Sequence, residues 1–198
     1  MASFDKTKDT VKFIYELGML KRVKRSGWWM AKIDDPESVA EHSHRTAAIA
    51  FVLAKMEGSH KAKEIALAAV FHDVLETRIL DVHKVHSAYL PTPKDVEHKI
   101  IADQRALMPK EAADELNAID ASFGSEEKAI LKDADYLECA FQAKEYYDIG
   151  YKDAKDWIDR VGQVLKTKSA RKLFGEMKKT DSSIWWKGLK QSVKELKY

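Results

Sequence analysis

The chain has few of the residues that staple or interrupt a fold. Its 198 residues include 1 cysteine, 4 prolines and 8 glycines. The single cysteine, Cys139, excludes an intramolecular disulfide and a thiolate zinc finger, and it fits a reducing compartment. Because Cys139 lies between apolar neighbours, we expect it to be a buried and unreactive thiol.

Long hydrophobic runs and an excess of one charge are also missing. No stretch approaches the roughly 20 apolar residues of a membrane span, and the start M-A-S-F-D-K-T-K-D lacks the apolar core of a signal peptide. Lys plus Arg number 34 and Asp plus Glu number 32, so the net charge is +2. We therefore expect a cytoplasmic protein that binds neither membranes nor nucleic acid polymers.

The alternating pattern of β-strands is absent, and a helical period of apolar residues dominates. A first helix ends near Gly18, and Pro36-Glu-Ser38 opens a second. Residues 79–93 look irregular. Further helices are predicted at about 60–75, 94–107, 110–121, 126–147, 152–166, 169–179 and 183–196. No linker or repeat divides the chain, so we predict an all-α fold that forms a single domain over residues 1–198.

Residues 70–76 read V-F-H-D-V-L-E and place groups that are costly to bury inside an apolar segment. On a helix, His72 and Asp73 point about 100° apart, but they still reach one ion lying beside the helix. Glu76, one turn later, overhangs the same site. A hydrogen-bonded polar pair is the alternative interpretation; the adjacent His-Asp with the following Glu favours a metal ion.

A second polar segment, P-E-S-V-A-E-H-S-H-R at 36–45, contains two histidines. His42 is in phase with Val39 and Thr46 on the apolar face of the predicted helix, whereas His44 lies about 200° away, towards solvent. His42 is therefore the better candidate for an inward-facing ligand.

The third segment is K-D-A-D-Y-L-E-C-A-F at 132–141. Asp133 and Asp135 flank its apolar stripe on opposite sides. Periodicity does not choose between them, and either carboxylate is also a candidate for a solvated face.

Together these motifs resemble a known family. A histidine, then an adjacent His-Asp pair, then a distant Asp resembles the signature of the HD-domain metal-dependent phosphohydrolases. The YfbR-like 5′-deoxynucleotidases resemble this chain further, over roughly residues 17–148, in L-K-R-V-K-R-S-G-W at 20–28, S-V-A-E-H at 38–42, H-D-x-x-E at 72–76, Asp81 and D-Y-L-E at 135–138. The resemblance implies a single helical HD domain that hydrolyses deoxynucleoside 5′-monophosphates to deoxynucleoside and phosphate.

Carried over residue by residue, the resemblance implies one divalent metal ion and favours Asp135 over Asp133 as a ligand. The implied ligands are His42, His72, Asp73 and Asp135. Two imidazoles and two carboxylates suit Mn or Co, and also Fe, Ni or Zn, better than Mg. HD enzymes with two metals use further histidines, for which His86 and His98 are the candidates.

The resemblance also implies residues that act on the substrate. Glu76 matches the catalytic carboxylate, Arg25 and Trp28 match residues on the substrate side, and Asp81 matches an Asp that contacts the sugar. Many relatives have Gly before that Asp, where this chain has Leu80.

Some questions stay open at the level of sequence. The family suggests a homodimer, and the pair Trp185-Trp186 is interpreted as packing or as a dimer contact. The alternatives are another HD reaction, on a nucleoside triphosphate or a cyclic phosphodiester, and a helical module that binds metal or nucleotide without turnover. The presence of Glu76 disfavours the binding module.

Overall fold

The structure, a computed structural model, describes residues 6–187 and residue 189. Within this part of the chain there are helices and one isolated β-bridge, between Lys24 and Ser38, but no strand. The helices are α1 (Thr7–Leu17), η1 (Gly18–Lys21), η2 (Ser26–Ala31), α2 (Val39–Met56), α3 (Ala62–Phe71), α4 (Glu76–Ile79), α5 (Lys84–Ser87), α6 (Lys94–Arg105), α7 (Lys110–Ser122), α8 (Ser125–Asp148), η3 (Lys152–Ala154), α9 (Lys155–Val164), α10 (Lys168–Lys179) and α11 (Ile184–Lys187). The predicted all-α fold is confirmed.

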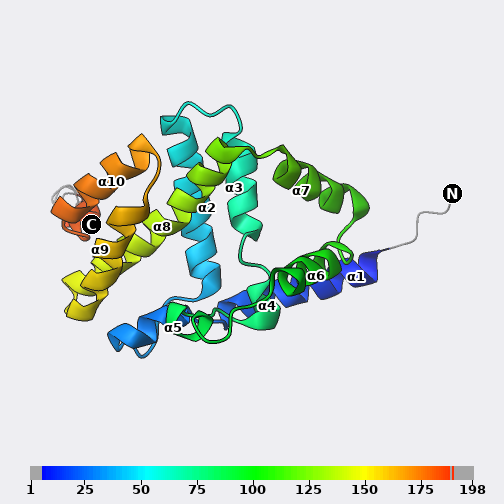
Figure 1. Ribbon diagram of the computed structural model, residues 1–198, viewed down its shortest axis with the longest axis horizontal. Helices are drawn as coiled ribbons and strands as arrows, with labels where there is room; N and C mark the ends of the chain where they lie inside the picture. The colour runs from blue at the N-terminus through cyan, green and yellow to red at the C-terminus, as the bar shows by residue number, and fades with distance from the viewer. Residues whose placement is uncertain (1–5, 188, 190–198) are drawn as a thin grey trace, which may run out of the picture.

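Three helices form the centre of the molecule (Figure 1). α2 packs against α3 and α8, and α3 also contacts α8. α9 and α10 cover α8 at one end of the molecule, whereas α1 and α6 lie at the other. Apolar side chains from α2, α3, α8, α9 and α10 make the first core cluster, which contains Leu53, Ile65, Ile130 and Leu137. The central helices therefore meet in a rigid core, and a site built on them is held firmly.

A second core cluster joins α1 to the segment that follows α3. Its buried members include Phe13 on α1, Val39 at the start of α2 and Val74. This cluster holds residues 72–76 against α1 and α7 and thereby fixes the position of that polar segment.

The start of α2 follows the sequence prediction. Ser38 is the N-cap: its Oγ accepts the N–H of Glu41 at 3.2 Å, and the Ser38 N–H donates to Glu41 Oε2 at 2.6 Å. This reciprocal pair satisfies two of the N–H groups that every helix start leaves open. Val39, His42 and Thr46 are all buried on the predicted inward face.

The prediction that the third helix runs to residue 75 is wrong, because α3 ends at Phe71. The His72 ring donates from Nδ1 to the carbonyl of Ala69 at 2.7 Å, the group that the Asp73 N–H would bind in a continuing helix. The chain then turns more tightly, with the Glu76 N–H bonded to Asp73 O at 3.0 Å. Glu76 still lies one tight turn beyond Asp73.

Two further outcomes concern helices late in the chain. The segment predicted as irregular, 79–93, contains the short helix α5, whose N-cap His83 accepts the His86 N–H at 3.2 Å. The helix predicted at 183–196 begins as α11, and its positions 188 and 190–196 lie outside the described residues. Trp185 keeps 73% of its surface exposed. Among the helices of residues 6–187 and 189, none has the length and apolarity needed to cross a membrane.

Candidate metal centre

Four polar side chains from three parts of the chain meet at one point. His42 comes from the first turn of α2, Asp135 from the middle of α8, and His72-Asp73 from the turn after α3. His42 Nε2 lies 3.2 Å from Asp135 Oδ1 and 3.5 Å from Asp73 Oδ2, and His72 Nε2 lies 3.1 Å from Asp73 Oδ2. Ligand atoms of His42, His72 and Asp135 all lie within 4.8 Å of one another, a spacing that one metal ion can bridge.

Both imidazoles direct a ring nitrogen at this point. His42 Nδ1 is 2.5 Å from Glu138 Oε2, and His72 Nδ1 is 2.7 Å from Ala69 O. Both partners are acceptors, so each Nδ1 carries the hydrogen and each Nε2 is left with the lone pair that a metal binds. His72 Nε2 is buried and has no hydrogen-bond partner among the described residues. An orphaned imidazole nitrogen facing two carboxylates fits a divalent cation.

The electrostatics of the cluster also favour a cation. Burial would raise the pKa of Asp135, but the His42 hydrogen bond and the Lys132 charge hold the pKa well below its usual range. Burial and the nearby Arg25 would lower the pKa of His42, but Asp135 and Glu138 outweigh them and raise the pKa to about 9. Without an ion, His42 therefore binds a proton at neutral pH, and a metal would compete with that proton for the same lone pair.

A second layer of polar groups supports His42, and sequence reasoning missed it. Glu138, which has no exposed surface, accepts from His42 on one oxygen and from Arg45 Nε on the other at 2.8 Å. Arg45 also binds Glu145 at 2.8 Å and Gln142 at 2.6 Å. Spacing in the sequence could have indicated these two residues. Arg45 follows His42 by three residues and Glu138 follows Asp135 by three, so each lies on the same side of its helix as a proposed metal-ligating residue.

Asp133, left open by periodicity, has a structural role. It has no exposed surface, and it accepts the backbone N–H groups of Lys166 at 3.0 Å and Thr167 at 2.7 Å, at the start of α10. Its hydrogen bonds thus anchor a neighbouring helix, while Asp135 lies at the His42 ring.

Glu76 lies above the cluster as a second unpaired group. Its Oε2 is buried without a hydrogen-bond partner among the described residues. Burial, and then the charges of Asp73 and Asp81, raise the pKa of Glu76 to about 9. The Glu76 carboxyl is therefore protonated at neutral pH when no ion is bound.

Arg25 and Asp81 form the wall beside the cluster. Arg25 Nη1 is 3.2 Å from Asp81 Oδ1 and 3.8 Å from Asp73 Oδ2. The Ser26 N–H donates to Asp81 Oδ2 at 2.5 Å, and Ser26 Oγ donates to the Asp81 carbonyl at 2.9 Å. The start of η2 and the segment after α4 are thus tied together, and a guanidinium is held next to the candidate ligands.

Leu80, just before Asp81, has an unusual backbone. Its φ is 64° and its ψ is 169°, a region that is almost restricted to glycine. A residue with a Cβ atom is strained in this conformation, so Leu80 occupies a position that suits Gly better. The contacts of Ser26 and Arg25 with Asp81 hold the chain in this conformation.

Trp28, predicted to lie on the substrate side, is buried in the core of this structure. Only 2% of Trp28 is exposed, and its ring packs against Tyr146 and Trp157 at centroid distances of 5.2 Å. Its indole N–H donates to Glu37 Oε1 at 3.0 Å. Aromatic packing thus holds the large ring in place against α8 and α9.

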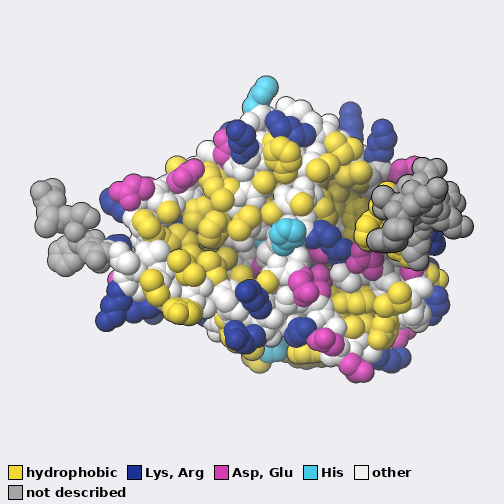
Figure 2. Space-filling view, turned by 180° about the vertical axis from the view of Figure 1, so that it is seen from behind, with side chains coloured by type: hydrophobic (Ala, Val, Ile, Leu, Met, Phe, Trp, Pro, Cys, Tyr) yellow, Lys and Arg dark blue, Asp and Glu magenta, His cyan; other side chains and the backbone are white. Residues whose placement is uncertain are grey.

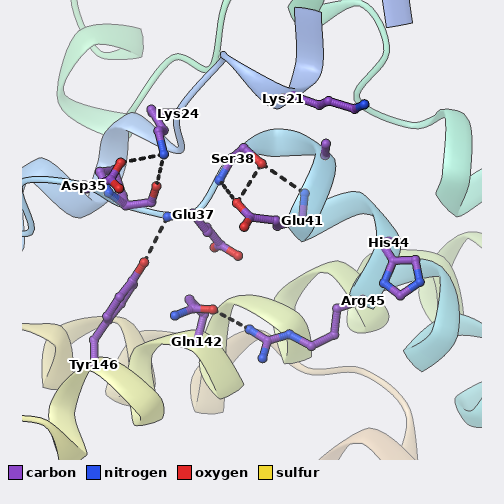
Figure 3. A pocket seen from close by; sticks show the side chains of 12 residues that line it. Lys21, Lys24, Asp35, Glu37, Ser38, Glu41, His44, Arg45, Gln142 and Tyr146 are labelled. Carbon is purple, nitrogen blue, oxygen red and sulfur yellow. Dashed lines mark hydrogen bonds and ion pairs between the residues drawn. The ribbon is translucent and has the colours of Figure 1, made fainter. Parts of the chain in front are cut away.

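A cavity of about 850 Å³ is lined by residues of the segment before α2, of α2 and of α8, and none of the four candidate ligands lines it (Figure 3). Glu37 points into it, with Arg45 and Gln142 on the opposite wall. Burial and the Glu138 carboxylate raise the pKa of Glu37 to about 7. Basic and acidic groups are mixed along this cavity, so no single charge marks it for a ligand.

The predicted thiol, Cys139, packs against the first core cluster and is half-buried. Burial raises its pKa to about 12, so the thiolate that reacts with oxidants or metals is scarce at neutral pH.

Comparisons with known proteins agree with this geometry. A family model described as HD domain matches residues 17–178. Mouse 5′-deoxynucleotidase HDDC2 is 30% identical over 152 residues, which cover 73% of this chain and 73% of that protein. A solved structure, predicted coding region AF1432 from Archaeoglobus fulgidus, is 34% identical, has a TM-score of 0.66 and covers 90% of this chain and 99% of that chain.

A further comparison concerns the fold alone. The cyanophage S-2L HD phosphohydrolase DatZ, bound to dA and one catalytic Zn²⁺ ion, is 20% identical with a TM-score of 0.54. The match covers 84% of this chain and 96% of that chain.

Proposed function

This chain belongs to the HD-domain family of 5′-deoxynucleotidases, and from that membership we propose that it hydrolyses deoxynucleoside 5′-monophosphates to deoxynucleoside and phosphate. One observation carries the proposal: two imidazole Nε2 atoms and two carboxylates converge beside a half-buried arginine and an unpaired carboxyl group. Such a set can hold a metal ion, a phosphate and a proton donor next to one another.

The proposed ligands of the metal ion are His42, His72, Asp73 and Asp135. Two nitrogens and two carboxylates suit Mn or Co, with Fe, Ni, Zn and Mg as the alternatives to test. When bound, a divalent ion lowers the pKa of a water and offsets the negative charge of the phosphate. DatZ, which shares the fold, is described with one catalytic zinc ion.

The chain's own residues supply the other requirements of the reaction. Hydrolysis bonds a water oxygen to phosphorus, breaks the bond from phosphorus to the 5′-oxygen, and leaves that oxygen in need of a proton. Arg25, held by Asp81 and Asp73, offers a guanidinium to the phosphate oxygens. Glu76, an unpaired buried carboxyl group beside the proposed ligands, is the proposed general acid that gives the leaving 5′-oxygen its proton.

Asp81 is the proposed contact to the sugar. Its carboxylate already accepts from Arg25 and from the Ser26 N–H, which fixes its orientation. A carboxylate has about four lone-pair positions, so a deoxyribose hydroxyl can still donate to it. Trp28, which is part of η2, supports this wall from the core: its indole N–H donates to the Glu37 side chain, and the Glu37 carbonyl accepts the Arg25 N–H at 3.0 Å.

The decisive experiment measures phosphate release by protein stripped of metal and reloaded with each divalent ion in turn. We expect release from deoxynucleoside monophosphates and slower release from the matched ribonucleotides. Equal rates on a matched pair would reduce the proposal to a general phosphomonoesterase. Products from nucleoside triphosphates or cyclic phosphodiesters alone would replace it with another HD reaction, and binding without turnover would make the chain a binding module.

The remaining proposals concern organisation. We propose one HD domain over residues 1–198 that forms a homodimer in the cytoplasm. Packing of α9 and α10 on α8 supports the single domain. Exposed apolar side chains on α1 and α2, such as Tyr15 at 80% and Val52 at 51%, offer surface for self-association, and broad hydrophobic areas are visible in Figure 2. Sedimentation of the full chain tests the dimer.

A further inference from the structure

Lys132 lies on α8 one turn before Asp135, beside the candidate metal centre. Its ammonium Nζ is 2.7 Å from Asp135 Oδ2, while the other oxygen of the same carboxylate, Oδ1, is 3.2 Å from His42 Nε2. The two oxygens of Asp135 therefore have different partners. One faces the ring of His42 in the cluster, and the other is held by a cation from the same helix.

Asp73, the other candidate carboxylate, is arranged differently. A single oxygen, Oδ2, lies 3.1 Å from His72 Nε2, 3.5 Å from His42 Nε2 and 3.8 Å from Arg25 Nη1. The cation beside Asp73 thus approaches the oxygen that already faces the imidazoles. The cation beside Asp135 approaches the oxygen that faces away from His42, so the two carboxylates are not equivalent.

A second contact holds Lys132 in this position. Its Nζ lies 4.8 Å from the centre of the Tyr136 ring, a cation–π contact, and Tyr136 itself packs against the first core cluster. The side chain of Lys132 is 54% exposed, and an ion pair at such a surface contributes little to the stability of a fold. The consequence of this pair is therefore to be sought at the Asp135 carboxylate.

We propose that Lys132 is a positioning residue that keeps Asp135 a one-oxygen ligand of the metal ion, an inference that rests on the proposed function. A free carboxylate can offer both oxygens to one ion and so fill two coordination positions. A carboxylate whose second oxygen binds an ammonium offers only one. Four protein ligands that fill one position each leave about two of the six that Mn²⁺ prefers. A water and a phosphate oxygen need those two positions.

The first test counts waters on the ion without any substrate. Bound Mn²⁺ speeds the relaxation of water protons in proportion to the number of waters that it exchanges with the solvent. In Lys132→Met, Asp135 is free to bind through both oxygens and displace one water. The relaxation enhancement per bound Mn²⁺ should therefore fall by about half. Lys132→Arg keeps a cation that binds carboxylates, so it should keep the wild-type value.

Lys144→Met is the matched control. Lys144 forms an ion pair with Asp148 at 2.6 Å on the same helix, and neither residue belongs to the metal cluster. Its removal should leave the relaxation enhancement per bound Mn²⁺ unchanged. Methionine and lysine have similar helix propensities, so we expect both methionine variants to fold. Thermal unfolding of the metal-free proteins checks this.

The second test separates substrate binding from turnover. In Lys132→Met, the phosphate of a deoxynucleoside 5′-monophosphate has to displace an Asp135 oxygen to reach the ion. We expect KM to rise by about 10-fold while kcat changes less. Lys132→Arg should return KM to near the wild-type value, because the arginine again holds the second oxygen of Asp135.

The outcomes separate the inference from the proposed function. A relaxation enhancement in Lys132→Met equal to that of wild type would overturn the inference even if kcat/KM falls, because the lysine would then act on the substrate and not on Asp135. Equal falls in Lys132→Met and Lys144→Met would overturn it as well. No phosphate release from any deoxynucleotide with any metal would refute the proposed function, and the water count on bound Mn²⁺ would still decide the role of Lys132. A wild-type chain that binds no Mn²⁺ would overturn both.

Discussion

His42 and Glu138 are joined by a hydrogen bond of 2.5 Å between Nδ1 and Oε2, and neither side chain has any exposed surface. The bond fixes which ring nitrogen of His42 carries the hydrogen, and Arg45 fixes the other Glu138 oxygen. A buried carboxylate behind a ligating histidine makes that histidine a stronger electron donor. The affinity of the centre thus depends on a residue that does not touch the ion.

We expect Glu138→Gln to weaken metal binding by about 10- to 100-fold, the usual effect of removing such a partner. The amide loses the negative charge that supports His42, and it places an N–H group near Arg45 or His42. Calorimetric titration of the metal-free protein with Mn²⁺ measures the change. Glu145→Gln is the control, since Glu145 binds Arg45 but not His42. Equal losses in both variants would contradict a specific role for Glu138.

Replacing the two candidate aspartates of α8 should have different effects, one on metal binding and the other on stability. Asp135→Asn removes a ligand charge and should abolish stoichiometric metal binding in a folded protein. Asp133→Asn weakens the hydrogen bonds to Lys166 and Thr167, so it should lower the free energy of unfolding by about 1–3 kcal/mol while metal binding per folded molecule persists. Denaturant unfolding combined with metal analysis tells them apart, and the reverse pattern would show that the assignment is wrong.

The sequence predicts the position of a side chain well when that position depends on its own helix. It predicts the position poorly when a distant helix decides which partner the side chain meets. The phase of His42 with Val39 and Thr46 predicted its burial correctly, because helical periodicity is local. Periodicity could not choose between Asp133 and Asp135. That choice depends on which partner, the α10 start or the His42 ring, reaches each side of α8.

Trp28 and α3 show two other limits. A tryptophan in a short polar segment fits a ligand platform as well as a core anchor, and only the contacts with Tyr146 and Trp157 decide. The end of α3 depends on a side-chain bond from His72 to Ala69, which competes with the backbone. Neither contact leaves a periodic signal in the sequence.

Glu76 offers a test of the division between ligands and catalyst. We expect Glu76→Ala to retain the metal and to release phosphate about 10²-fold more slowly or worse, because the general acid is gone. Activity on a nucleotide analogue with a much better leaving group should fall less, since that group needs no proton. Metal analysis accompanies the kinetics, and loss of the ion would make Glu76 a ligand instead.

Glu16 predicts a pH dependence of stability that lies outside the metal centre. Its carboxylate accepts from Arg78 Nε at 2.7 Å, Gln104 and Thr77, and chiefly the Arg78 hydrogen bond lowers its pKa from 4.5 to about 2. Because the folded state binds this proton more weakly, the stabilisation is complete above about pH 4.5 and is lost as the pH falls towards 2.

The variant Glu16→Gln isolates this contribution. The difference in free energy of unfolding between wild type and variant should be largest near pH 6 and should shrink as the pH falls from 4.5 to 2. Urea unfolding across that range measures it. A difference that does not change with pH would mean that the network acts through packing and not through the charge of Glu16.

Leu80 yields the last prediction, because its backbone conformation suits glycine and its side chain is 53% exposed. A non-glycine residue in this region lowers the free energy of unfolding by about 1–3 kcal/mol through backbone strain. Glycine removes the strain, but it makes the unfolded chain more flexible, which lowers the free energy of unfolding by about 0.5–1 kcal/mol. Leu80→Gly should therefore raise the free energy of unfolding by about 1 kcal/mol. Leu80→Ala keeps the strain and loses only an exposed side chain, so it should stay within about 0.5 kcal/mol of wild type. Urea unfolding of the three proteins with metal removed gives the ranking, and a Gly variant less stable than the Ala variant would show that the Leu80 backbone is not strained.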